Sequence, residues 1–250
     1  MPSIIRIASL LSIVSFLAIP ASSHKTPRNR LTHPQSPLSN NNLTSPHAPS
    51  LQTPLSTREY WMHQTFAALN TSGSPCPFYP FAAVVVNHTN SHAGNGHGEL
   101  ICTGVNRGRQ TGNMMLHGEV AAILNCTKTL QDPRGKFGLT PAETIAAFAE
   151  LSIYTNAESC PMCASAIRWN GFKEYIYGTS IDTLVELGFA QIAISSGEVF
   201  DAAQGLPSDT SFLGDVLTGE TDALFAWQFD DMAECPWGCL RGAEGNCEAA

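Results

Sequence analysis

Two short segments, far apart in the sequence, carry side chains that could hold a metal ion. The first is His117-Gly118-Glu119, and the second is Cys160-Pro161-Met162-Cys163. One imidazole and two thiolates are ligands that suit Zn²⁺, and three protein ligands leave the fourth tetrahedral position to a water molecule. A structural zinc site would close with a fourth Cys or His, and no motif in the sequence places one. The pattern therefore predicts an open, catalytic zinc site.

The flanking sequence predicts which elements position these side chains. Both segments precede helix-like runs, and the second also follows a strand-like run. We therefore expect His117, Cys160 and Cys163 at two helix N-termini that face one point. Free N–H groups and the helix dipole favour thiolates there, so both Cys pKa values should be lowered. Glu119 is expected to face the water and to shuttle protons.

The order H-x-E followed by C-x-x-C is similar to the cytidine and deoxycytidylate deaminase-like superfamily of zinc deaminases. The resemblance covers roughly residues 58–195. It implies that His117, Cys160 and Cys163 bind Zn²⁺ and that Glu119 is the catalytic general acid and base.

Details of the motifs resemble different branches of this superfamily. Residues 116–120, with the later Asn125-Cys126, are similar to fungal cytosine deaminases. Residues 159–164, with Ala166-Ile167, resemble guanine deaminases and tRNA adenosine deaminases. One position departs from the pattern, because Ser159 stands where the superfamily usually has Pro before the first Cys. The motifs therefore leave cytosine, guanine and adenine open as substrates.

Asn106 is the candidate substrate-binding residue. It precedes the H-x-E motif by the same interval as the base-binding Asn of the superfamily, so the resemblance implies that it orients the base. Asn-Arg-Gly is also good turn chemistry, and a turn residue is the alternative interpretation.

Strand-like and helix-like runs alternate over residues 55–230, which predicts one three-layer α/β/α domain. The resemblance implies that its strands form a mixed five-stranded sheet of the cytidine deaminase type. Ser56 or Thr57 should cap the first helix, and Pro141 should begin another. The expected strands are 81–88, 99–106, 151–155, 173–178 and 191–195. Further helices are expected at 161–170, 181–188 and 219–229. An irregular insertion is expected at 127–138 and a loop at 199–210.

The N-terminus predicts export. Residues 1–23 combine an early Arg, an apolar run and small residues, as in a secretory signal peptide, and no later segment is apolar enough to predict a membrane span. Residues 24–54 are rich in Pro, Ser and Asn and are expected to be disordered. The protein is therefore expected to be secreted. Four sequons support this expectation and would be glycosylated at Asn42, Asn70, Asn87 and Asn125.

Cysteine usage agrees with an oxidising compartment. Once two of the eight cysteines are assigned to zinc, six remain, and six cysteines allow about 15 pairings. We expect the Cys- and Gly-rich tail, residues 231–250, to be stapled to the domain. The six are Cys76, Cys102, Cys126, Cys235, Cys239 and Cys247.

Charge restricts the class of substrate. From Arg58 onward the chain has nine Lys and Arg against 21 Asp and Glu, a net charge of −12. Because a phosphate backbone is bound through Lys and Arg, this balance disfavours nucleic acid and favours a small base or nucleoside.

These features together predict a secreted, zinc-dependent hydrolytic deaminase of a small nucleobase or nucleoside. A deaminase acting on RNA or DNA and a non-enzymatic, zinc-stabilised secreted module are the alternatives. The superfamily often assembles, which implies a homodimer.

Overall fold

The computed structural model describes residues 53–89 and 96–250. The expected signal peptide (1–23), nearly all of the Pro-rich segment (24–54) and the sequon at Asn42 lie outside the described residues. Within the described part, no helix combines the length and apolar character that a bilayer span requires.

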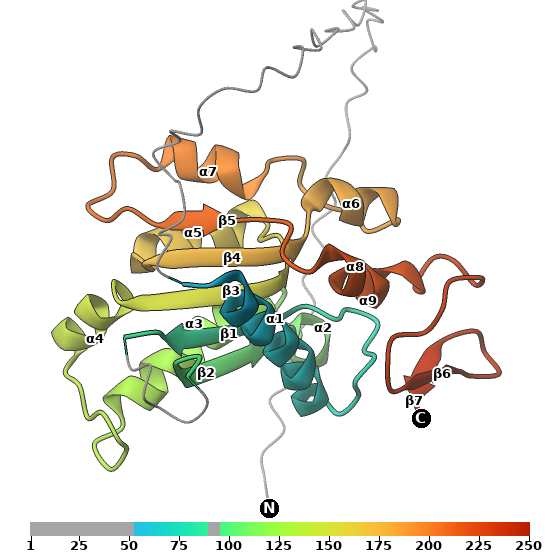
Figure 1. Ribbon diagram of the computed structural model, residues 1–250, viewed down its shortest axis with the longest axis horizontal. Helices are drawn as coiled ribbons and strands as arrows, with labels where there is room; N and C mark the ends of the chain where they lie inside the picture. Colours follow the sequence, from blue (N-terminus) through green and yellow to red (C-terminus); the bar gives the residue numbers. More distant parts are fainter. Residues whose placement is uncertain (1–52, 90–95) are drawn as a thin grey trace, which may run out of the picture. The chain divides into compact units, whose positions relative to one another are not determined.

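A mixed five-stranded sheet lies at the centre of the described domain (Figure 1). Its strands are β1 (Ala82–Asn87), β2 (Glu99–Val105), β3 (Leu151–Ala157), β4 (Glu174–Thr179) and β5 (Ser211–Leu213). They lie in the order β2-β1-β3-β4-β5. β1 pairs antiparallel with β2 and β3, whereas β3 pairs parallel with β4 and β4 with β5. The mixed sheet predicted from the sequence is confirmed.

Helices cover both faces of this sheet and complete the three layers (Figure 1). In chain order they are α1 (Leu55–Leu69), the 3-10 turn η1 (Asn70–Ser72), α2 (Gly108–Thr111), α3 (Gly118–Gln131), α4 (Pro141–Phe148), α5 (Pro161–Asn170), α6 (Ile181–Glu186), α7 (Ser196–Ala202), α8 (Thr218–Thr221) and α9 (Ala223–Ala226). Residues of α1, α6 and α9 pack on one face of the sheet, and residues of α3, α4, α5 and α7 pack on the other.

The alternation of side chains along β1 explains the two cores. Val84 and Val86 point into the core under α1, and Ala83 and Val85 point into the core under α3 and α5. All four side chains are fully buried, as a strand with both faces covered requires. Burial of each Val stabilises the domain by about 1.5–3 kcal/mol, so this interior strand holds both layers together.

Helix starts follow local capping chemistry. Thr140 caps α4 in a reciprocal capping box with Glu143, and Pro141 occupies the first turn as expected. The expected cap at Ser56 or Thr57 is wrong, because α1 begins at Leu55 after Pro54. The Thr57 hydroxyl instead lies 3.1 Å from Nδ1 of His97.

The expected strand at 191–195 is wrong, and β5 takes its place in the sheet. Ile192 and Ile194 are 59% and 42% exposed, so this apolar run contributes no core. It ends at Ser195, which caps α7 in a second capping box, and α7 occupies the start of the expected loop at 199–210.

Two expected elements also differ in extent or continuity. α3 continues to Gln131, so the helix includes the start of the expected insertion at 127–138. The expected helix at 219–229 is divided into α8 and α9. Three apolar side chains of this segment are nevertheless buried: Leu224, Phe225 and Trp227.

The C-terminal tail forms a small hairpin of β6 (Cys239–Arg241) and β7 (Cys247–Ala249). Cys76–Cys239 joins it to the domain and Cys235–Cys247 closes it internally, which confirms the expected staple. The third disulfide, Cys102–Cys126, joins β2 to α3.

A half-buried imidazole, that of His88, follows the end of β1. Nδ1 of His88 lies 3.0 Å from the carbonyl oxygen of His97, and its Nε2 lies 2.8 Å from the hydroxyl of Tyr154. A carbonyl only accepts, so Nδ1 carries the proton and Nε2 accepts from the tyrosine. Burial lowers the pKa of His88 below its ordinary value. The folded state therefore favours the neutral form of the His88 imidazole.

Candidate metal and substrate site

Strand directions bring the two motif-bearing helices to the same edge of the sheet. β2 and β3 both run antiparallel to β1, so their carboxyl ends lie at one edge. α3 follows β2 through α2 and a short loop, and α5 follows β3. The carboxyl edge of strands is where open α/β sheets bind ligands.

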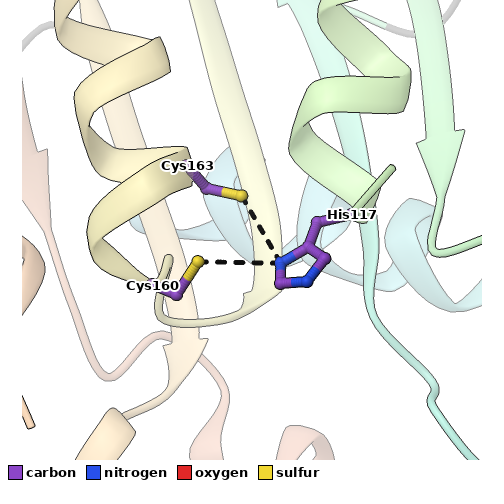
Figure 2. Close-up of side chains that lie close together, drawn as sticks. All are labelled: His117, Cys160 and Cys163. Atoms are coloured by element: carbon purple, nitrogen blue, oxygen red, sulfur yellow. Dashed lines mark hydrogen bonds between the residues drawn. The ribbon is translucent and has the colours of Figure 1, made fainter. Parts of the chain in front are cut away.

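The three expected metal ligands converge at this edge, as Figure 2 shows. His117 is the N-cap residue of α3 and Cys160 is the N-cap residue of α5, so both lie at helix N-termini as predicted. Cys163 follows in the first turn of α5 and is fully buried. The two helices therefore present one imidazole and two sulfurs to one point.

The distances fit a tetrahedral zinc ion. Nδ1 of His117 lies 3.6 Å from Sγ of Cys160 and 3.7 Å from Sγ of Cys163. With a Zn–S distance of about 2.3 Å and a Zn–N distance of about 2.05 Å, tetrahedral angles place sulfur and nitrogen about 3.6 Å apart. The ligand atoms all lie within 4.8 Å of one another. Three ligands at this spacing would hold zinc and leave one coordination position open.

The two thiols differ in protonation. A hydrogen bond from Cys163 lowers the pKa of Cys160 to about 4, and that same hydrogen bond raises the pKa of Cys163. The expectation that both Cys pKa values are lowered is therefore wrong for the protein alone, because the two sulfurs share one proton. The hydrogen bond with Cys160 also raises the pKa of His117. A divalent cation would take the place of the shared proton and favour two thiolates.

Glu119 lies in the first turn of α3, beside the ligand cluster, and is 7% exposed. Burial raises its pKa above the ordinary value, and the negative charge of Cys160 acts in the same direction. Oε1 of Glu119 accepts a hydrogen bond of 2.8 Å from the hydroxyl of Ser159. A buried carboxyl group with a raised pKa has the property needed to exchange protons near neutral pH.

A cavity of about 310 Å³ opens beside these groups. Asn106, the candidate base-binding residue, lies on its wall directly after β2. Its Oδ1 accepts from the backbone N–H of Gly108 at 3.0 Å, which leaves the Nδ2 hydrogens to donate to a ligand. The turn interpretation and the ligand interpretation of Asn106 are thus compatible. The lining residues are Pro77, Phe78, Tyr79, Phe81, Asn106, Arg107, Arg109, Gln110, Met114, His117, Glu119, Glu158, Cys160, Phe189, Ala190 and Gln191.

Sequence reasoning missed the aromatic wall of this cavity. Phe81 and Phe189 contact each other with ring centroids 5.8 Å apart, and Arg109 lies over the ring of Tyr79 at 4.7 Å. These residues come from three segments with no motif, so only the fold brings them together. Faces of aromatic rings suit stacking with a planar base.

Glu158 is a second residue whose role the motif did not reveal. Its carboxylate accepts from the backbone N–H of Ile181 at 2.9 Å and from the N–H and the hydroxyl of Ser196, each at 2.7 Å. These N–H groups begin α6 and α7, so one carboxylate holds the two ends of the segment 181–196, which consists of α6 and the loop that carries Phe189 and Gln191. The sequence feature that could have pointed to Glu158 was its position directly before Ser159 and Cys160.

The described sequon residues differ in their surroundings. Asn70 is exposed at the end of α1. Oδ1 of Asn87 accepts from the N–H and the hydroxyl of Thr89 at 2.9 and 2.6 Å. Asn125 is exposed on α3, but its Nδ2 donates to the carbonyl oxygen of Thr103 at 2.9 Å. A sugar on the Asn125 nitrogen would compete with that hydrogen bond.

Fold and site together define a class: an α/β domain with a zinc-type ligand set and a buried carboxylate at the carboxyl edge of its sheet. Comparison with known sequences gives the family. The cytidine and deoxycytidylate deaminase zinc-binding region matches residues 55–179, half of the chain, and the chain belongs to this family. The resemblance seen in the motifs is confirmed.

Individual relatives show how far the likeness extends. A probable cytosine deaminase of Schizosaccharomyces pombe is 27% identical over 109 residues, which are 44% of this chain and 52% of that protein. A guanine deaminase of Bacillus subtilis is 30% identical over 110 residues, 44% of this chain and 56% of that protein. The chain thus matches about half the length of these curated relatives. A solved guanine deaminase from Nitrosomonas europaea has a TM-score of 0.48 at 18% identity, covering 72% of this chain and 86% of that one.

Proposed function

We propose that this protein is a secreted, zinc-dependent hydrolytic deaminase of a small nucleobase or nucleoside. One observation carries the proposal: Asn106, His117, Glu119 and Cys160 line the same cavity, with Cys163 completing the ligand set behind it. The names of the relatives, a probable cytosine deaminase and a guanine deaminase, support the same reaction class.

The chain's own residues account for substrate placement and proton transfer. His117, Cys160 and Cys163 would hold the metal, which supplies a water of lowered pKa for attack on the ring carbon that bears the amine. Glu119 accepts one proton from the water and delivers it to the ring nitrogen. It then takes the second proton from the attacking oxygen and passes it to the amine, so that the C–N bond breaks and ammonia leaves. The Nδ2 of Asn106 donates to an acceptor on the base. The Phe81 and Phe189 side chains exclude water and stack against the ring.

Cavity size and charge support a small substrate. A volume of about 310 Å³ lies at the lower end of the range for ligand sites, which suits one base or nucleoside. The net charge of −12 from Arg58 onward works against a phosphate backbone. A deaminase acting on RNA or DNA would need a cationic groove continuous with the cavity, and Arg107 and Arg109 are the cations that line it.

Export is supported by two independent features. The sequence of residues 1–23 has the organisation of a signal peptide. Six cysteines of the described domain pair as three disulfides, which is typical of an oxidising compartment. Bound metal would protect the two remaining cysteines, Cys160 and Cys163, from oxidation.

Ammonia release from a panel of substrates tests the proposal. The panel contains cytosine, guanine, adenine, their nucleosides and a mixed single-stranded oligonucleotide, each at low and physiological salt. We expect turnover of a free base or nucleoside that changes little with salt, because no phosphate needs neutralising. Faster and salt-sensitive turnover of the oligonucleotide would favour the nucleic-acid alternative. Stoichiometric zinc without ammonia release from any substrate would favour the non-enzymatic module.

A further inference from the structure

Position 159 sets this chain apart from the usual pattern of its family. Ser159 replaces the Pro that usually precedes the first Cys, and its side chain is completely buried. Its backbone N–H donates to the hydroxyl oxygen of Tyr175 at 2.6 Å. Proline has no N–H and could not make this bond. The serine and the tyrosine therefore form a pair that a proline would break.

The side chain of Ser159 makes a second directed contact. Its hydroxyl donates to Oε1 of Glu119 at 2.8 Å, across a sequence separation of 40 residues. Glu119 is 7% exposed, so little water is available to replace this partner. A line of hydrogen bonds thus runs from β4 through Ser159 to the carboxyl group of α3.

This contact distinguishes the two oxygens of Glu119. Oε1 is held by the hydroxyl of Ser159, so the two oxygens of the carboxyl group have different surroundings. A carboxyl group without such a partner would rotate about its last side-chain bond, whose energy wells are broad. Holding a catalytic group in its reactive orientation lowers the barrier because the ordering has been done before substrate arrives.

We propose that Ser159 is a positioning residue for Glu119, anchored in turn by Tyr175. The proposal rests on the proposed deaminase function, and it assigns to this chain a hydrogen-bonded support where the family usually has an imino acid. Ser159 is neither a candidate metal ligand nor one of the residues that line the cavity. It acts through the orientation of the Glu119 carboxyl group.

Ser159→Ala removes the hydroxyl and keeps the backbone N–H to Tyr175. We expect kcat to fall by roughly 10- to 100-fold with KM within about twofold of wild type, because displacement of a catalytic group by small distances has effects of this size. Ser159→Thr, which retains a hydroxyl, should recover most of the loss. Ser165→Ala is the matched control, because it removes the same atom from α5 with no bond to Glu119. Zinc content should stay at one equivalent in all three variants.

Crystal structures of the zinc-loaded wild type and Ser159→Ala protein give a readout that does not depend on turnover. We expect one orientation of the Glu119 carboxyl group in the wild type and more than one in the variant. A single unchanged orientation in the variant, or an equal fall of kcat in the Ser165→Ala control, would overturn the positioning role. An inactive wild type would contradict the proposed function alone, since the crystallographic comparison would still decide what Ser159 does to Glu119.

Discussion

Glu158→Gln should damage both the stability of the domain and the substrate cavity. The wild-type carboxylate accepts three hydrogen bonds with distances between 2.7 and 2.9 Å from the starts of α6 and α7. The glutamine amide has one accepting oxygen. If that oxygen serves Ser196, the NH₂ group must face the N–H of Ile181, which places two donors against each other.

The magnitude follows from these contacts. A hydrogen bond to a charged group contributes about 1.5–3 kcal/mol, and the opposed donors add to the loss. The residue is 8% exposed, so solvent compensates little. We expect the free energy of unfolding to fall by about 3 kcal/mol, which for a domain of this size lowers Tm by roughly 6–12 °C. The segment 181–196, which includes the loop with Phe189, would no longer be held at its two ends, so KM should rise more than kcat falls.

Denaturant unfolding of the zinc-loaded protein, together with steady-state kinetics on the substrate identified in the panel, would measure both effects. Glu186→Gln makes the same chemical change at an exposed position of α6 and is the matched control. A change below about 1 kcal/mol, equal to that of the control, would refute the reasoning that Glu158 fixes the two helix starts.

Three further predictions concern the metal, the pH and the glycans. Cys163→Ser should lose the single zinc equivalent, and full zinc content in this variant would contradict the ligand assignment. Glu119→Gln should retain zinc while kcat falls by about 10²- to 10⁴-fold. Metal analysis measures the first effect and ammonia release the second. Because burial lowers the folded-state pKa of His88, protonation favours the unfolded state, so stability should decline as the pH falls through about 6.5. Thermal scans of His88→Gln should show less of this decline, and an identical slope would exclude the assignment. In protein expressed through a secretory pathway, glycopeptide mass spectrometry should find more sugar at Asn70 than at Asn125, whose Nδ2 is hydrogen-bonded; the reverse order would contradict the argument.

Sequence analysis predicted the place of the candidate metal site better than the edges of the fold. His117 and Cys160 lie at helix starts as expected, because strand, turn and capping signals are local and repeat in both motifs. The fifth strand was misplaced, since an apolar run such as Gln191–Ser195 has the composition of a strand whether or not a neighbour is available. β5 pairs with β4 over three residues, and so short a pairing leaves almost no pattern to detect.

The aromatic wall of the cavity could not be predicted for a different reason. Phe81 and Phe189 are far apart in sequence, and each is an ordinary apolar residue in its own segment. The role of Glu158 could be seen only in the structure, because its partners include backbone N–H groups, which every residue type except proline has. Six cysteines left about 15 pairings open until the fold placed each sulfur beside its partner.

The Cys76–Cys239 disulfide has a consequence for biosynthesis. It joins residues 163 positions apart, and Cys76 directly precedes Pro77 and Phe78 of the cavity wall. A nascent chain emerges N-terminus first, so in a chain exported as proposed the three candidate metal ligands would all meet an oxidising lumen before Cys239 has been synthesised. During that interval Cys76 has no native partner, while Cys160 and Cys163 are available for mispairing. Early binding of zinc would remove the thiols of Cys160 and Cys163 from thiol–disulfide exchange. Cys76 would then stay unpaired until Cys239 of the tail is synthesised. Supply of metal in the compartment of synthesis would then govern the yield of correctly paired protein.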